Sequence, residues 1–116
     1  MTRIKGKSVY GTVDLLVLRT LERGGEMHGL AIIDEVRKSS GDYLKLEDGA
    51  LYPALHRLQK EGLLKAEWRI SDKRRRARFY AITPAGRREL QRTILDWKEH
   101  TGAVCKVLGI AWEEKR

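Results

Sequence analysis

Apolar residues near the start of the chain recur at helical spacing in two segments. The first segment predicts a helix from a capping Thr12 to about Glu22, where Gly24–Gly25 end it. The second predicts a helix that starts near His28 and stops at Ser39–Gly41. The two stripes consist of Val13, Leu16, Val17 and Leu21, and then of Leu30, Ile32, Ile33 and Val36.

A third apolar stripe predicts a helix whose start is limited by Pro53. Proline lacks an N–H and is tolerated only close to a helix start, so this helix should begin between Asp48 and Ala50. Glu61–Gly62 end it, with the glycine as a left-handed cap. The preceding segment, 43–47, alternates weakly and is either a short strand or an extended loop. The stripe consists of Leu51, Leu55, Leu58 and, at the end, Leu63.

Two alternating runs, 64–70 and 77–82, then predict strands, with Trp68 and Ile70 on one face of the first. The polar turn between them, Ser71–Arg76, makes them a hairpin with a densely cationic tip. A basic hairpin directly after a helix is typical of a DNA-binding wing.

Thr83 and Pro84 supply the cap and the first position of a long last helix, which should reach about Leu108. Its apolar residues lie at alternating intervals of four and three, the spacing of a heptad seam. Three short helices and a hairpin are too small to cover this seam, so we expect a second copy of the chain to cover it. The seam consists of Leu90, Ile94, Trp97, Thr101, Val104 and Leu108.

The whole pattern predicts a mainly α fold with a small β-hairpin. We expect a winged helix-turn-helix DNA-binding domain over residues 1–82, and a C-terminal dimerisation helix and tail over residues 83–116. The charge supports this interpretation, because the chain has 24 Lys and Arg against 16 Asp and Glu, a formal net charge of +8. The segment 65–92 alone carries ten basic and three acidic residues, and a cluster of this kind can hold phosphates.

In the winged layout, the third helix enters the major groove and the wing contacts the backbone or the adjacent minor groove. The residues that the apolar stripe leaves free should contact DNA, together with the hairpin tip. The helical N-terminus can also receive a phosphate. The expected DNA contacts are His28, Gly49, Ala50, Tyr52, Pro53, His56, Arg57, Lys60, Lys73, Arg74, Arg75 and Arg76.

Other classes of function find little support in the sequence. His28, His56 and His100 lie on separate elements without metal-ligand spacing, and no glycine-rich phosphate loop is present, so we expect no enzyme, metal or cofactor. The lone Cys105 cannot form an internal disulfide, and the apolar run 15–18 is far too short to cross a bilayer, so a cytoplasmic protein without a membrane partner is expected. A winged module that binds another protein is the alternative, and the basic wing argues against it.

Three motifs resemble the PadR family of bacterial transcriptional regulators: MHGLAI at 27–32, GALYPALHRLQKEGLL at 49–64 and RRARFYAITPAGRREL at 75–90. They follow one another in the family's order within residues 27–90, about half of the chain. Leu30 departs from the family pattern, which has Tyr there. The short tail is similar to the small subfamily with a single C-terminal helix.

The resemblance implies a repressor that dimerises through its last helix and binds an inverted-repeat operator. Some small members of the family hold a flat aromatic molecule at the dimer interface against a tryptophan of that helix. Trp97 stands at the matching place and would be faced by Leu15, Leu18 and Arg19. The resemblance leaves two roles open for Trp97: a platform for a small aromatic effector, or a core residue of the dimer.

Overall fold

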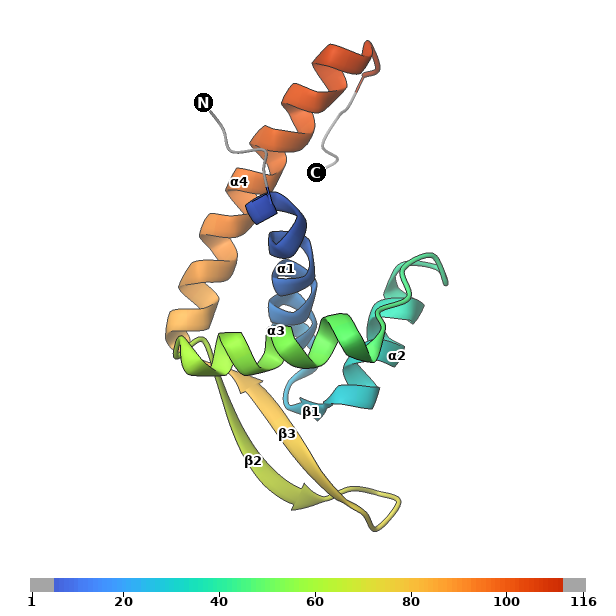
Figure 1. Cartoon of the computed structure of the whole chain (residues 1–116), viewed down its shortest axis with the longest axis vertical. Helices are drawn as coiled ribbons and strands as arrows, with labels where there is room; N and C mark the ends of the chain where they lie inside the picture. Colours follow the sequence, from blue (N-terminus) through green and yellow to red (C-terminus); the bar gives the residue numbers. More distant parts are fainter. Residues whose placement is uncertain (1–5, 112–116) are drawn as a thin grey trace.

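The computed structural model describes the backbone of residues 6–111 and the side chains of residues 12–111. Four helices and three strands alternate with short connections (Figure 1). In chain order they are α1 (Gly6–Gly24), β1 (Met27–His28), α2 (Gly29–Ser39), α3 (Asp48–Lys60), β2 (Leu64–Ile70), β3 (Arg76–Ile82) and α4 (Pro84–Leu108). This order confirms the mainly helical winged helix-turn-helix fold with a long last helix.

Side-chain caps mark the starts of two helices, α2 and α4. The His28 Nδ1 accepts the backbone N–H of Ala31 at 3.3 Å and caps α2, and the Thr83 Oγ1 accepts that of Gly86 at 3.0 Å and caps α4. The α3 helix begins inside the expected window. The segment 43–47 is an extended loop rather than a strand.

The expected start of the first helix at Thr12 is wrong, because α1 already begins at Gly6 and ends at Gly24. Glycines at positions 6 and 11 lowered the expected helix propensity of this stretch. The apolar spacing of Val9 and Val13 nevertheless continues the stripe by one turn towards the N-terminus.

The sheet has one strand more than the expected hairpin, in the order β1-β3-β2. The β1 strand pairs Met27 with Tyr80 and His28 with Phe79, antiparallel to β3. The β2 strand pairs along its full length with β3, from Leu64 opposite Ile82 to Ile70 opposite Arg76. A strand of two residues is too short to show alternation, so β1 left no pattern in the sequence.

One hydrophobic core joins the helices to the base of the sheet. Figure 1 shows α1 in the middle of the molecule, with α4 along one side and α3 crossing in front. The largest fully buried side chains are Leu18, Leu21, Ile32, Leu51, Leu55, Leu58, Leu90 and Val17. Burial of each such side chain contributes about 1.5–3 kcal/mol.

Two of the expected site residues belong to this core. Leu90 is 0% exposed and lies in the core of its own protomer, so a partner chain cannot reach it. Leu18 is buried in the same cluster and is not open to a ligand. The heptad spacing did not separate the first turns of α4, which pack on α1, from the later turns, which extend beyond the rest of the molecule (Figure 1). Within residues 6–111, no helix is long and apolar enough to cross a membrane.

Candidate nucleic-acid interface

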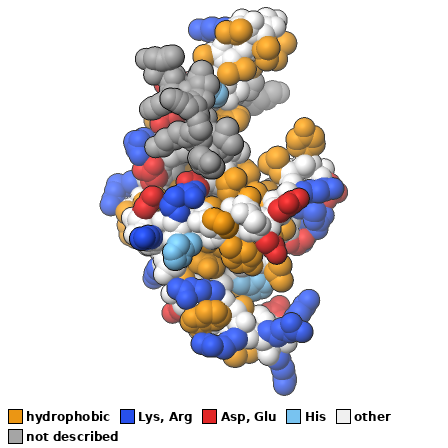
Figure 2. Space-filling view, in the orientation of Figure 1, with side chains coloured by type: hydrophobic (Ala, Val, Ile, Leu, Met, Phe, Trp, Pro, Cys, Tyr) orange, Lys and Arg blue, Asp and Glu red, His pale blue; other side chains and the backbone are white. Residues whose placement is uncertain are grey.

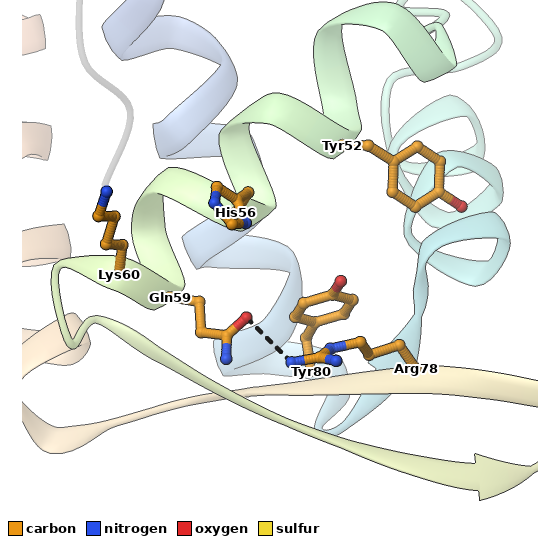
Figure 3. A pocket seen from close by; sticks show the side chains of 6 residues that line it. All are labelled: Tyr52, His56, Gln59, Lys60, Arg78 and Tyr80. Carbon is orange, nitrogen blue, oxygen red and sulfur yellow. Dashed lines mark hydrogen bonds between the residues drawn. The ribbon is translucent and has the colours of Figure 1, made fainter.

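A groove runs between α3 and the hairpin of β2 and β3. Its walls come from one exposed side of α3 and from β3 (Figure 3). Figure 2 shows Lys and Arg side chains gathered over the hairpin at the foot of the molecule. The lining residues are Tyr52, His56, Gln59, Lys60, Arg78 and Tyr80. The structure thus brings three of the expected DNA contacts, Tyr52, His56 and Lys60, to the same groove.

The first turn of α3 continues this exposed side. Asp48, Gly49, Ala50 and Pro53 are all exposed, while the next positions of the stripe are buried. Nothing lies within 4 Å of the place where a side chain of Gly49 would begin, so the backbone of this turn is open to a close approach.

Tyr52 is half-buried and has a packing role as well. Its ring points towards the start of α2 (Figure 3), and its Oη lies only 2.3 Å from the ideal Cβ position of Gly29. Burial raises the pKa of the Tyr52 phenol, and the nearby carboxylate of Asp48 raises it further. Tyr52 therefore holds α3 against α2 as a neutral phenol.

Arg57 does not line the groove, and its side chain is partly exposed. Its guanidinium donates to the Asp14 carboxylate and ties α3 to α1. Burial raises the pKa of Asp14 from its ordinary value, although the charge of Arg57 acts in the opposite direction. Sequence spacing alone could not show that a carboxylate 43 positions away reaches this arginine.

His28 also has a structural task, as the cap of α2. Its ring meets the Phe79 ring edge-on, with the centroids 5.3 Å apart and the planes at 86°. The resulting packing joins the start of α2 to the middle of β3.

The hairpin tip has an ordered turn that presents cations. The Ser71 carbonyl accepts the N–H of Arg74 at 2.9 Å, and the Ser71 Oγ accepts those of Lys73 and Arg75 at 3.3 and 3.4 Å. Arg74 has a φ of 58°, in the left-handed region. Within residues 12–111, none of the side chains of Lys73, Arg74, Arg75 and Arg76 forms an ion pair.

Three further residues, Trp68, Arg78 and Gln59, lie at the site although the sequence pattern did not predict them there. The guanidinium carbons of Arg76 and Arg78 lie 4.6 and 5.4 Å from the centroid of the Trp68 ring. Arg78 also donates to the Gln59 Oε1 at 3.4 Å, across the groove (Figure 3). The alternation of residues along β2 predicts that Trp68 and Ile70 share one face of the strand. Only the pairing of β2 with β3 shows that Arg78 lies opposite Trp68.

The outer turns of α4 expose apolar side chains, whereas the groove is lined mostly by polar and basic ones. Hydrophobic side chains gather over the far end of this helix (Figure 2). Trp97 is 42% exposed, and Val104 and Leu108 are exposed as well, whereas Ile94 and Thr101 are partly buried. Leu95 and Val107 are two further exposed apolar residues of α4. On α1, Leu15 is partly buried and Arg19 donates to Glu22 at 2.7 Å.

Comparison with known proteins gives one consistent result. The model of the transcriptional regulator PadR-like family matches residues 17–92. The transcriptional regulator Rv3488 of Mycobacterium tuberculosis is 38% identical over 86 residues, which cover 66% of this chain and 77% of the relative. Among solved structures, a transcriptional regulator from Clostridium thermocellum superposes with a TM-score of 0.76 at 26% identity, covering 87% of this chain and 97% of that one. A PadR family transcriptional regulator from Eggerthella lenta superposes with a TM-score of 0.72 at 28% identity, covering 84% and 82%.

Proposed function

Since this chain belongs to the PadR-like family of transcriptional regulators, which bind DNA and are not enzymes, we propose that it is a repressor acting as a homodimer on an inverted-repeat operator. Repression follows from occupation of promoter DNA. The observation that carries the proposal is the groove between α3 and the wing, with cations at its outer end that form no ion pair within residues 12–111.

The two walls of the groove suit different parts of a duplex. The exposed side of α3 carries His56 and Lys60, which can donate to base edges or phosphates in the major groove. The hairpin tip carries Lys73, Arg74 and Arg75, whose charges suit the phosphates beside the adjacent minor groove. The open N-terminal turn of α3, at Gly49 and Ala50, suits a phosphate because the helix dipole places partial positive charge there, although the Ala50 N–H already donates to the Glu47 carbonyl at 3.0 Å.

Dimerisation is proposed through the outer turns of α4. Trp97, Val104 and Leu108 are exposed there. Their burial against a second copy gains about 25 cal/mol per Å² of apolar area. A two-fold dimer with recognition helices about 34 Å apart would read two half-sites one helical turn apart.

We further propose that a small aromatic effector binds at the dimer interface. Trp97 supplies an exposed indole, and Leu15 and Arg19 on α1, a helix that packs on α4, are partly buried. An effector that binds there would change the spacing of the two α3 helices and release the operator. In its absence, Trp97 packs as a core residue of the dimer.

Selection of bound fragments from genomic DNA by the purified protein tests the function. The expected result is an enriched inverted repeat whose half-site centres lie about one helical turn apart. Fragments without a shared repeat, bound no better than bulk DNA, would contradict the repressor assignment. Binding of a protein partner without any duplex binding would favour the interaction module instead.

A further inference from the structure

On the side of the hairpin that faces the groove, the residues change from buried and apolar at the base to exposed, with two arginines, further out. At its base the cross-strand pair Leu64 and Ile82 is buried in the core. Further out, the same side carries Trp68 opposite Arg78, and then Ile70 opposite Arg76. Trp68 is 51% exposed and Ile70 is 65% exposed. A large, half-exposed indole therefore stands beyond the reach of the core, with two arginines of β3 close to its ring.

The two arginines are fixed by the indole and not by carboxylates. Their guanidinium carbons lie 4.6 Å (Arg76) and 5.4 Å (Arg78) from the ring centroid, within the range of a cation–π contact. Within residues 12–111, neither arginine forms an ion pair. A guanidinium that stacks by its face keeps N–H donors at its edge, and these remain able to bind a phosphate.

On the opposite side of the hairpin, by contrast, an arginine is paired with carboxylates. There, Arg69 lies over Phe79 with its guanidinium carbon 5.8 Å from the ring centroid, but it also pairs with Glu26 at 2.7 Å and with Glu67 at 2.9 Å. The two carboxylates thus neutralise the arginine on the side of the hairpin that faces away from the groove. It leaves the positive charge of Arg76 and Arg78 on the side of the groove.

We propose that Trp68, held between Arg76 and Arg78, is a further DNA-binding residue, whose indole packs on the deoxyribose of the strand whose phosphates the two arginines neutralise. An apolar ring flanked by cations matches an apolar sugar flanked by phosphates. The surface is continuous with the groove, because Arg78 donates across it to Gln59 of α3. This charge and continuity favour a duplex over a protein as the occupant.

The inference rests on the proposed DNA-binding function, and fluorescence of the full chain tests it. Replacing the other two tryptophans (W97F/W112F) leaves Trp68 as the only indole. This protein is titrated with a short mixed-sequence duplex at low salt, where sequence-independent binding is strong. The expected result is that saturating duplex lowers acrylamide quenching of Trp68 at least about twofold, since a deoxyribose covers the ring. Unchanged quenching on a saturated complex would overturn the inference.

Affinity for the same duplex gives a second measurement. W68A should bind about tenfold more weakly than the unsubstituted chain, because two cation–π contacts and the apolar contact are lost together. W68F should fall between them. The matched control is Y43A, which removes an 84% exposed aromatic from the loop between α2 and α3, on the far side of α3 from the hairpin (Figure 1). Y43A should bind within about twofold of the unsubstituted chain.

The outcomes distinguish a failure of the proposed DNA-binding function from a failure of the proposed role of Trp68. If the unsubstituted chain binds no duplex, both the inference and the proposed function are overturned. If it binds, and W68A and Y43A bind equally well, only the role of Trp68 is overturned. Thermal unfolding of W68A serves as the check on folding, and the quenching experiment stands without that variant.

Discussion

The phenol of Tyr52 on α3 occupies the space that a side chain at Gly29 on α2 would need. The distance from the Tyr52 Oη to the ideal Cβ position of Gly29 is 2.3 Å, and two further ring atoms lie within 2.8 Å. The angle between the two helices of the helix-turn-helix thus depends on a contact between one glycine and one tyrosine. Both residues fall within motifs of the sequence, but these motifs do not show that the two touch.

Substitution G29A should push the Tyr52 ring out towards the groove. The expected cost is about 1–3 kcal/mol in the free energy of unfolding, because overpacking forces the ring or the helix to shift. Denaturant unfolding of G29A, Y52A and the double variant measures it. The costs should be non-additive, with G29A nearly harmless once Y52A has removed the ring. Additive costs would mean that the two residues do not constrain each other.

The hairpin tip should govern the salt dependence of DNA binding. With about 6–10 phosphate contacts per dimer, affinity should fall about 10³–10⁵-fold between 50 and 200 mM salt. Substitution R74A/R75A should lower the slope of log affinity against log salt by about 4 per dimer, one unit for each lost contact. Arg76 is left in place because it stacks on Trp68.

The matched control for the tip is R92A/K106A, which removes the same charge from exposed positions of α4. Its slope should stay close to that of the unsubstituted chain. A slope that is unchanged in R74A/R75A, or lowered equally in both variants, would exclude the tip from the interface.

Asp14 should make stability depend on pH in an unusual direction. Burial raises its pKa above the ordinary 3.8, so the folded state binds the proton more tightly than the unfolded state does. Ionised Asp14 therefore destabilises the fold at neutral pH, and protonation relieves this cost as pH falls towards 3.8. In urea unfolding, the stability of the unsubstituted chain relative to D14N should rise as the pH is lowered. If it falls instead, the pair with Arg57 outweighs the burial of the carboxyl.

A charge in the proposed dimer seam should separate the protomers. V104E places a carboxylate among Trp97 and Leu108, and the dimer should weaken about a hundredfold, since an unpaired buried charge costs several kcal/mol. The control K106E places a carboxylate on the polar side of the same helix and should leave the dimer intact. Sedimentation velocity over a range of concentrations checks both variants. Equal effects of the two substitutions would place the interface elsewhere.

The sequence predicted the features that depend on local pattern. The cap at Thr83, the limit that Pro53 sets on α3, and the turn before Arg76 all follow from backbone chemistry close by in the chain. It missed β1, because a strand of two residues has no periodicity. It also missed the first turn of α1, because glycines there lower the helix propensity.

The misplaced site residues share a physical cause, which is tertiary contact over a long sequence separation. Arg57 is drawn to Asp14 on another helix, and Leu90 and Leu18 are covered by elements distant in the chain. The heptad spacing of α4 is the same in the core and beyond it, so spacing could not tell Leu90 from Val104. The role of Trp68 became visible only with the register of β2 and β3.

Photocrosslinking to the selected operator tests the central claim, that α3 and the hairpin contact one duplex together. A photoreactive residue replaces His56 on α3, Arg75 at the hairpin tip or, as the control, Tyr43 on the loop between α2 and α3. The account predicts crosslinks from position 56 inside a half-site and from position 75 to the flanking backbone, with little from position 43. Equal crosslinking from position 43, or none from positions 56 and 75 on a bound operator, would contradict it.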